Sequence, residues 1–135
     1  MPSMAPTPGG TVLEAESANF DGGRPETEAN GGPGYVDFRD AAERNWIEWS
    51  FEAPQAGTYL LELRYAAAEP RQYRSRLRVN GADAGSIVLW PTGGESTWAW
   101  DRQPVLLDKG AHRIRLEPNG PVLIDHLNVI FCDRS

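Results

Sequence analysis

The sequence predicts an all-β fold, an antiparallel β-sandwich, from three observations. Short runs in which apolar and polar residues alternate recur along the chain, as half-buried strands require. Turn signals rich in Gly, Pro, Asn and Asp separate these runs at intervals of about 8–12 residues. No stretch shows an apolar repeat with the period of a helix. Together these signals predict about eight or nine short strands.

The first half of the chain contains the clearest alternation. The strands predicted here are the segment around Glu14–Glu16, then Tyr35–Phe38, Trp46–Phe51 and Thr58–Ala66. In the last of these, the odd-numbered residues 59–65 share one face, because side chains two apart point the same way. Trp46 and Trp49 fall on opposite faces of their strand, so at least one of them points partly outward. Residues 19–34 are rich in Gly, Pro, Asn and acids and are predicted to form a long loop.

The second half repeats this pattern up to the last predicted strand. Its predicted strands are Arg74–Val79, Ser86–Trp90, Trp98–Leu107, His112–Leu116 and Val122–Phe131. The dipeptide Asn80-Gly81 is a strong hairpin signal. Because Pro104 has no backbone N–H, it predicts an edge strand or a bulge.

Composition restricts the class of protein. The 135 residues fit one domain, predicted over residues 11–135, and residues 1–10 read as a Pro/Thr/Gly linker or a cloning remnant. The net charge of −6 argues against a general affinity for nucleic acid or anionic membranes. No apolar run approaches the ~20 residues of a membrane span. The lone Cys132 excludes an intrachain disulfide.

Three acids suggest a metal site. In an extended chain, Glu14 and Glu16 point toward the same spot. Asp125 falls on the apolar face of the last strand with Leu123 and Leu127, where an unpaired charge is costly. Oxygen donors alone favour calcium over zinc or copper. Two other interpretations stay open: a solvated glutamate face, and an Asp125 held by backbone or hydroxyl hydrogen bonds.

The order of these signals resembles carbohydrate-binding modules of families 6 and 35, which are jelly-roll sandwiches of the galactose-binding type. The resemblance covers about residues 12–131. The segments on which it rests are EAESA, GGPGYV, QAGTYLLELRYA, RLRVNG, LLDKGAHRIRL and LIDHLNV. Each segment alone is weak evidence, but their order and spacing make a fairly specific match.

The resemblance implies a structural calcium ion. In such modules the Glu-x-Glu of the first strand and an Asp of the last strand bind it, and a carbonyl of the glycine-rich loop completes the site. Carried onto this chain, the metal ligands are Glu14, Glu16, Asp125 and a carbonyl near Gly31. The residue-level argument selects the same three acids.

Sugar binding needs flat aromatic faces and a few polar groups. The resemblance places the main site in loops at one end of the sandwich and matches Tyr35 to an aromatic residue that lines it. The full set of expected ligand-binding residues is Tyr35, Trp90, Trp98, Glu28 and Asn119. A core position for Tyr35 or Trp98 and a simple turn position for Asn119 stay open as alternatives.

Two positions depart from the family pattern. Glu95 stands where the family often has a stacking tryptophan, so Trp90 or Trp100 is expected to take that role. Leu123 stands where an Asn commonly binds the sugar. The usual loop site is therefore expected to be altered, moved or absent.

Several arginines cluster between residues 71 and 78, and arginine binds carboxylate or sulfate groups bidentately. This leaves open an acidic polysaccharide as the target. The alternative is a solvated strand face that balances nearby acids.

The expected function is that of a non-catalytic module which targets an appended polysaccharide-degrading enzyme to glycan. We expect it to be a monomer in a larger secreted, extracellular protein, without nucleic-acid or membrane partners. One alternative is a protein-interaction or assembly domain. Another is a small glycosidase or lyase, but there is no Gly-x-Ser-x-Gly elbow, and His112 and His126 have no evident partner in the sequence.

Overall fold

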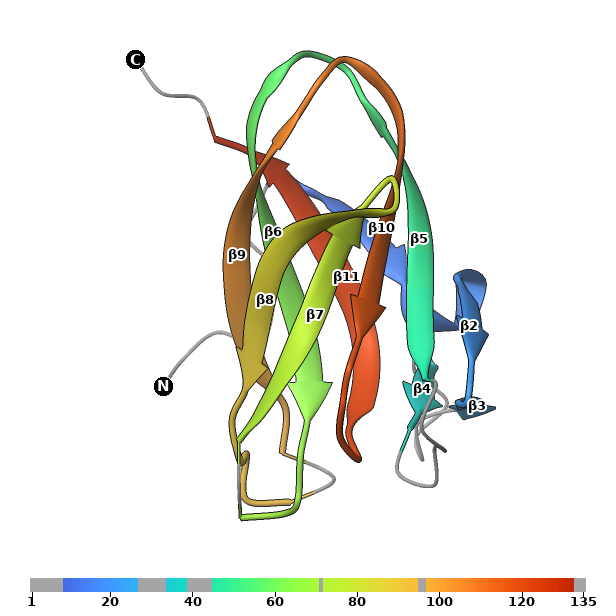
Figure 1. Ribbon diagram of the computed structural model, residues 1–135. Coiled ribbons are helices and arrows are strands. Elements are labelled where there is room, and N and C mark those ends of the chain that lie inside the picture. Colours follow the sequence, from blue (N-terminus) through green and yellow to red (C-terminus); the bar gives the residue numbers. More distant parts are fainter. Residues whose placement is uncertain (1–8, 27–33, 39–44, 71, 95–96, 133–135) are drawn as a thin grey trace.

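The protein consists of two antiparallel sheets that face each other across an apolar core (Figure 1). This computed structural model describes residues 9–26, 34–38, 45–70, 72–94 and 97–132, without the side chain of Glu16. Sheet A contains β1 (Thr11–Glu14), β3 (Arg24–Glu26), β4 (Tyr35–Asp37), β6 (Gly57–Ala66), β9 (Ala99–Leu107) and β11 (Leu123–Phe131). Sheet B contains β2 (Asn19–Asp21), β5 (Trp46–Ala53), β7 (Tyr73–Val79), β8 (Ala82–Leu89) and β10 (Gly110–Glu117). The predicted antiparallel sandwich is confirmed.

The central strands follow the predicted alternation. Strand order is β3-β4-β11-β6-β9 in sheet A, where β1 also pairs with β11, and β2-β5-β10-β7-β8 in sheet B. On β6, Tyr59 and Tyr65 and the leucines between them on the same face are at most 1% exposed. Burying each such side chain stabilises the fold by about 1.5–3 kcal/mol. Pro104 lies on β9, at the edge of sheet A, as predicted.

The described residues form eleven strands, more than the eight or nine predicted. The additional strands β2 and β3 lie in residues 19–34, which the sequence predicts as loop. Both are three-residue strands at sheet edges with mainly exposed side chains. Backbone pairing with β5 and β4 forms them. Apolar alternation therefore gave no sign of them.

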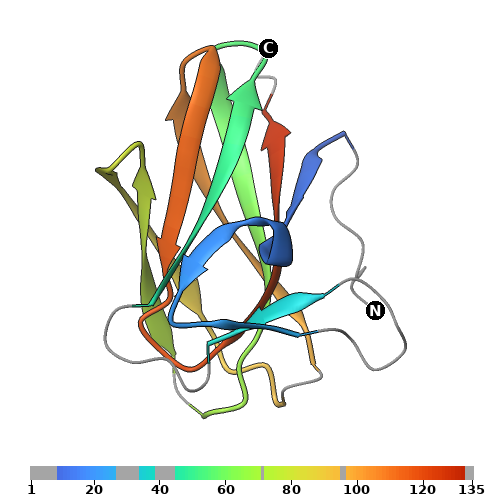
Figure 2. The ribbon, with the colours of Figure 1, turned by 90° about the vertical axis from the view of Figure 1, so that its right-hand side faces the viewer.

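The chain enters sheet B through a short helical turn. β1 ends at Glu14, and the 3-10 helix η1 (Ala15–Ser17) follows, closed by a 3.0 Å bond from the Ala18 N–H to the Ala15 carbonyl. Figure 2 shows β1, η1 and β2 passing along the side of the sandwich from sheet A to sheet B. The prediction that Glu14 and Glu16 belong to one extended strand is therefore wrong. The described part of the chain holds no helix long or apolar enough to cross a membrane.

The two ends of the sandwich differ in their connections. At one end, at the top of Figure 1, tight turns of two or three residues join β5–β6, β7–β8 and β9–β10. One of them is the predicted Asn80-Gly81 hairpin, with φ of 54° and 85°. Longer connections, β6–β7, β8–β9 and β10–β11, lie at the opposite end, which we call the loop end. Strand β4 also begins near the loop end (Figure 1).

Candidate functional site

A bulge in β11 creates a polar cluster on sheet A. Register against β6 runs from Ile124↔Tyr65 to His126↔Arg64, so Asp125 is an extra residue without a partner in the ladder. Ile124 joins the core before the bulge and Leu127 after it. The predicted unbroken alternation of Asp125 with the apolar residues of this strand is therefore wrong. Asp125 is nevertheless buried, at 4% exposed, as predicted.

Glu14, Asp125 and His126 come together around this bulge. One potential metal-binding atom of each lies within 4.8 Å of the others. Glu14 is opposite His126 in the β1–β11 register, which explains their proximity. His126 Nδ1 lies 3.4 Å from Asp125 Oδ2, and Arg64 forms an ion pair with the same carboxylate. The expectation that His126 has no partner is wrong.

The surroundings of Asp125 keep it ionised. Burial alone would raise the pKa of this carboxyl group, but the hydrogen bonds from His126 and Arg64 outweigh burial and lower it. Its Oδ1 atom is buried and makes no hydrogen bond to any described residue. A buried anionic oxygen without a hydrogen bond suits a cation.

The donor set fits a divalent cation in part. Glu14 and Asp125 offer carboxylate oxygens, which calcium prefers, whereas an imidazole nitrogen such as that of His126 does not suit calcium. The Glu16 side chain and Gly31 lie outside the described residues, so the predicted four-ligand set is assembled only in part. The described residues thus form a cluster that could hold a metal ion.

An aromatic pair lies beside this cluster. Tyr35, the first residue of β4, and Trp98, just before β9, meet edge to face with ring centroids 5.6 Å apart. The Arg64 guanidinium carbon lies 4.8 Å from the centroid of the Trp98 ring. Both rings are half-buried, and neither belongs to the apolar core. The structure therefore brings together two of the predicted sugar-binding residues, with a charged group that the sequence analysis missed.

Trp90 stands apart from this pair, and its backbone is firmly anchored. Its side chain is 52% exposed, and its backbone N–H donates a 2.9 Å hydrogen bond to the Tyr65 hydroxyl. Two residues on, Thr92 bonds to Ala67 through its backbone N–H at 2.8 Å and its hydroxyl at 3.1 Å. An exposed ring on a fixed backbone is a preorganised contact surface.

The Tyr65 hydroxyl that holds the Trp90 backbone is itself bonded to the carboxyl group of Asp101. The hydroxyl group is the donor in this bond. Burial raises the pKa of Asp101, although the Tyr65 hydrogen bond and nearby Arg102 oppose the increase. Burial and the Asp101 hydrogen bond also raise the pKa of Tyr65. The hydroxyl therefore stays protonated at neutral pH and available as a donor.

The remaining predicted residues are placed differently. Asn119 has a left-handed φ of 62° and donates a 3.4 Å hydrogen bond to the Arg74 carbonyl, which suits a turn residue. Leu123 is 3% exposed and offers no polar group to a sugar. Trp100 meets His126 edge to face at 5.0 Å. Glu28 lies outside the described residues.

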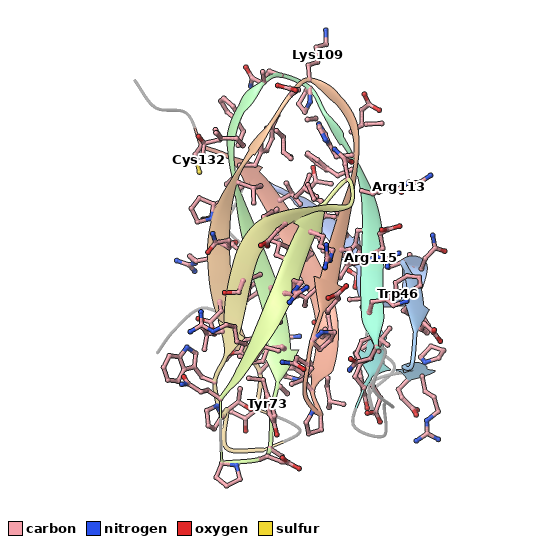
Figure 3. All side chains as sticks on the ribbon, in the orientation of Figure 1. Trp46, Tyr73, Lys109, Arg113, Arg115 and Cys132 are labelled. Atoms are coloured by element: carbon pink, nitrogen blue, oxygen red, sulfur yellow. The ribbon has the colours of Figure 1, made fainter. Side chains whose placement is uncertain are left out.

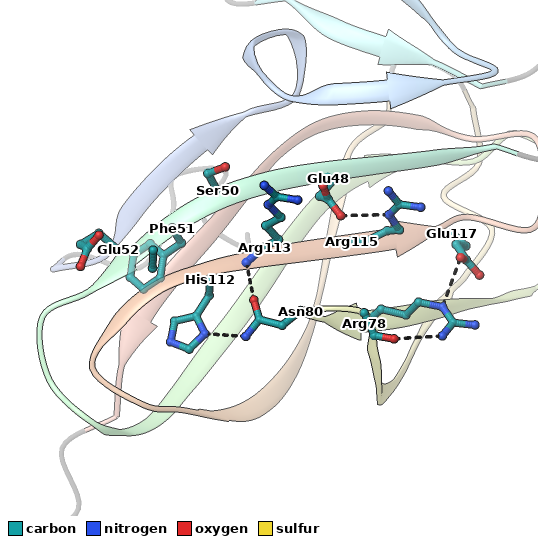
Figure 4. Close-up of a pocket in the computed structure, with 12 residues that line it drawn as sticks. Glu48, Ser50, Phe51, Glu52, Arg78, Asn80, His112, Arg113, Arg115 and Glu117 are labelled. Atoms are coloured by element: carbon teal, nitrogen blue, oxygen red, sulfur yellow. Dashed lines mark hydrogen bonds and ion pairs between the residues drawn. The ribbon is translucent and has the colours of Figure 1, made fainter.

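Sheet B carries a second surface, which we call the arginine groove. Five arginines of two adjacent strands form it, namely Arg74, Arg76, Arg78, Arg113 and Arg115. It consists of two adjoining hollows of about 1090 and 940 Å³, which share Arg115 and Glu117. Figure 3 shows Trp46, Arg113 and Arg115 on this side of the molecule, and Figure 4 shows the larger hollow. The predicted opposite faces of Trp46 and Trp49 are confirmed, since Trp49 is 3% exposed in the core and Trp46 lines the groove.

Comparison with known proteins places this fold among carbohydrate-binding modules. No protein-family model matches the sequence. A cycloisomaltooligosaccharide glucanotransferase of Niallia circulans is 31% identical over 102 residues, which are 73% of this chain and 10% of that enzyme. The chain spans about a tenth of the length of the curated relatives that it matches.

Two solved structures of single modules match over nearly their full length. A family 35 carbohydrate-binding module from Clostridium thermocellum superposes with a TM-score of 0.82 at 29% identity, over 91% of this chain and 98% of that one. The C-terminal family 6 module of a marine laminarinase from Zobellia galactanivorans shares the fold, with a TM-score of 0.78 at 24% identity over 90% and 98% of the two chains. The predicted resemblance to families 6 and 35 and the jelly-roll fold are confirmed.

Proposed function

We propose that this chain is a non-catalytic carbohydrate-binding module that holds an appended polysaccharide-degrading enzyme on its glycan. The observation on which the proposal depends is the set of aromatic side chains at the loop end, namely the Tyr35–Trp98 pair and, apart from it, the exposed and anchored Trp90. Flat rings contact the C–H face of a sugar, and polar groups beside them fix its hydroxyl groups. Arg64, whose guanidinium carbon lies 4.8 Å from the centroid of the Trp98 ring, supplies such a polar group.

The size of the match supports the appended role. The chain aligns with the solved structure of a single module along nearly the whole length of that module, but with only a tenth of a curated enzyme. We propose residues 11–135 as the module and residues 1–10 as linker, within a larger extracellular protein. A single site of this kind binds weakly, roughly micromolar to millimolar, and linkage to a second domain makes it useful. A monomer without nucleic-acid or membrane partners completes the proposal.

The acid cluster argues against a hydrolase at this position. A glycosidase needs one carboxyl group with a raised pKa as its general acid. Asp125 has a lowered pKa and is paired with Arg64, so it does not suit that role. A metal-binding role for Glu14 and Asp125 is more consistent with these contacts.

We further propose that calcium binds Glu14 and Asp125, joined by the Glu16 carboxylate and the Gly31 carbonyl. The ion would link the end of β1 to β11 and neutralise the buried acids. If it binds only the folded state, calcium at about 100 times its Kd stabilises by about 2.7 kcal/mol. We expect the Tm to rise by several degrees with calcium, to rise less with magnesium, and to stay unchanged by calcium in Asp125→Asn.

A glycan array tests the main proposal. We expect binding to a neutral glycan that is weakened by Tyr35→Ala, Trp98→Ala or Trp90→Ala. Leu106→Ala is the matched control, because Leu106 is 80% exposed but lies near the opposite end of the sandwich. Repeating the array with a chelator shows whether the metal is needed. Binding to no glycan, with capture of a partner protein instead, would favour the assembly-domain alternative.

The other expected ligand residues remain part of the proposal. Glu28 and Asn119 are proposed to accept or donate hydrogen bonds to sugar hydroxyl groups at the loop end. Asn119 already donates one amide N–H to the Arg74 carbonyl, which leaves its second N–H and its side-chain oxygen for a sugar. An acidic target, by contrast, is supported by the arginine groove rather than by the loop end.

A further inference from the structure

We infer that Tyr65 and Asp101 are positioning residues, which hold the exposed ring of Trp90 in place for a glycan. The inference deepens the proposed glycan-binding function, on which it rests. Tyr65 is fully buried in the core and cannot touch a ligand, so it acts through the backbone of Trp90. Asp101 is half-buried and acts through its hydrogen bond with Tyr65.

The two positioning residues come from adjacent strands of sheet A. Tyr65 of β6 is opposite Ala99 of β9, and Asp101 lies two residues further along β9. Side chains two residues apart on a strand share a face, so Asp101 is a diagonal neighbour of Tyr65 on the core side of the sheet. A tyrosine side chain is long enough to reach such a neighbour. The strand register thus explains why the Tyr65 hydroxyl meets the Asp101 carboxyl group.

The Tyr65 side chain links the two sheets of the sandwich. Its ring packs into the core from β6 in sheet A, and its hydroxyl oxygen accepts a 2.9 Å hydrogen bond from the Trp90 N–H. Trp90 directly follows β8, the edge strand of sheet B. A phenylalanine at position 65 would fill the same volume but would offer this N–H no acceptor. The hydroxyl group, and not the ring, therefore ties Trp90 to the core.

The three residues form one chain of hydrogen bonds. Trp90 donates to the Tyr65 oxygen, and Tyr65 donates its own hydrogen to Asp101. A hydroxyl group that donates to a carboxylate becomes a better acceptor, because hydrogen bonds in a chain polarise one another. Asp101 also fixes the direction of the hydroxyl hydrogen, which leaves the oxygen lone pairs for Trp90. Asp101 therefore strengthens the hold on Trp90 through a bond that it makes to Tyr65.

A second contact holds the chain on the other side of the Trp90 ring. Pro91 follows Trp90 and favours an extended backbone there. Thr92 then bonds to the Ala67 carbonyl through its backbone N–H at 2.8 Å, and its hydroxyl oxygen accepts the Ala67 N–H at 3.0 Å. Because the backbone is held on both sides, a sugar that binds has to order little more than the Trp90 side chain. Freeing one side would add an entropy cost to binding, which appears as weaker affinity.

Another tyrosine of the same strand provides a matched comparison. Tyr59 is also buried, at 1% exposed, and its hydroxyl donates a 2.6 Å hydrogen bond to the Gln55 carbonyl. Gln55 lies in the β5–β6 turn, at the end of the sandwich opposite the loop end. Removing either hydroxyl group breaks hydrogen bonds of a core tyrosine, so the two losses of stability should be similar. The Tyr65 hydroxyl is bonded to a proposed sugar-binding residue, whereas the Tyr59 hydroxyl is not.

Isothermal titration of variants that lack one hydroxyl group tests the inference. The ligand is the neutral hexasaccharide that the wild-type protein binds most tightly among cello-, manno-, xylo- and isomaltohexaose. Tyr65→Phe should weaken its binding about fivefold, the effect expected from the loss of one hydrogen bond. Tyr59→Phe is the control and should change the affinity less than about twofold. The Tm should fall by a similar amount in both variants, so a difference in affinity cannot come from stability.

A double-mutant cycle measures whether Tyr65 acts through Trp90. Trp90→Ala removes the ring that Tyr65 positions, so adding Tyr65→Phe to that variant should weaken binding no further. Asp101→Ala should weaken binding about twofold to threefold, because the hydroxyl group loses its acceptor. Asp101→Asn keeps an acceptor oxygen and should bind the hexasaccharide like the wild-type protein.

Hydrogen exchange of the Trp90 backbone amide, followed by NMR, gives a measurement that needs no glycan. This amide bonds to a buried hydroxyl group, so it should exchange slowly in the wild-type protein. In Tyr65→Phe it should exchange at least about tenfold faster, since local opening then breaks no hydrogen bond of this amide. Tyr59→Phe should leave its exchange rate unchanged.

The inference and the proposed function can fail separately. Unchanged exchange of the Trp90 amide in Tyr65→Phe would overturn the inference, and so would equal losses of affinity in the two phenylalanine variants or additive losses in the double mutant. Hexasaccharide binding that is lost in Tyr35→Ala but unchanged in Tyr65→Phe would refute the positioning role alone. A wild-type protein that binds no glycan would refute the proposed function, and the positioning role with it, even where the Trp90 amide is protected as expected.

Discussion

Each of the two sheets carries an ion pair between an arginine and an acidic residue, but the two pairs differ in how far they are exposed to water. On sheet A, Asp125 is buried and Arg64 is mostly covered, with side chains 5% and 15% exposed. On sheet B, Arg78 and Glu117 are 30% and 34% exposed. Desolvation makes a buried pair costly to break, whereas water and salt screen an exposed one. The difference suggests that burial assigns the first pair to stability and leaves the second available for recognition.

The largest expected effect is on the free energy of unfolding, when the acidic residue of each ion pair is replaced in a separate variant. Asp125→Ala should lower the free energy of unfolding by about 3 kcal/mol, because it removes one partner of a buried pair. Glu117→Ala should cost less than about 1 kcal/mol. Urea denaturation of both variants measures the difference.

These measurements should be made with a chelator present, so that loss of a metal ligand does not add to the effect of Asp125→Ala. Asp125→Asn keeps the volume of the side chain and serves as the control for packing. Similar losses for the Asp125 and Glu117 variants would remove the distinction between the two faces.

A smaller effect, on glycan affinity, should show that the two faces of the sandwich bind different ligands. Trp98→Ala should weaken neutral-glycan binding about tenfold to a hundredfold, the range of a central aromatic contact. Trp98→Phe should retain most of the affinity, because the ring still faces Tyr35 and Arg64. Binding of an oligogalacturonate, an acidic glycan of the kind proposed for the arginine groove, should be unchanged in both variants. Titration of each variant with both glycans checks this, and a parallel loss for the two ligands would mean that they share one site.

The sequence predicted the parts of the fold that depend on local pattern. The two-residue period of β6 and the turn dipeptide Asn80-Gly81 each involve residues that are close together in the sequence, so the sequence alone is enough to recognise them. The predicted proximity of Glu14 and Asp125 is confirmed, although the extended geometry assumed for Glu14 and Glu16 is wrong.

Features that depend on pairing between distant strands could not be predicted in this way. The bulge at Asp125 exists only in the register of β11 with β6, and it brings Arg64 and His126 to the same carboxylate. The groove likewise depends on β10 lying between β5 and β7. The sequence showed the cluster of arginines but not that Arg113 and Arg115 would join it.

Acidity should affect the loop end through Asp101. Its pKa is raised in the folded state, so the folded protein holds this proton more tightly than the unfolded chain does. The contribution of Asp101 to stability is therefore greatest below the unfolded pKa of about 3.9 and is lost as the pH rises through the higher folded value. Asp101→Asn keeps an oxygen that can accept the Tyr65 hydrogen bond. Because it cannot titrate, this variant should lack the pH-dependent contribution of Asp101 to stability.

Thermal unfolding of both proteins across this pH range measures the effect as a difference between the two curves. The wild-type protein should lose stability relative to Asp101→Asn as the pH rises from about 4. The opposite slope would contradict the raised pKa that burial gives Asp101. Asp108→Asn, in the turn at the other end of the sandwich, is the control for a general change in charge.

The smallest expected effect is a gain of affinity in the groove. Glu48 accepts a 3.0 Å hydrogen bond from Arg115, and Glu48→Gln removes its negative charge but keeps an oxygen for that bond. Oligogalacturonate binding should tighten about twofold to threefold, which corresponds to roughly 0.5 kcal/mol in a solvent-screened groove. Neutral glycans should bind as before, because the loop end is unchanged. If Glu48→Gln instead weakens oligogalacturonate binding, then the carboxylate contributes more by accepting sugar hydroxyl groups than it costs by repulsion, and the groove recognises the hydroxyl groups of its ligand as well as the charge.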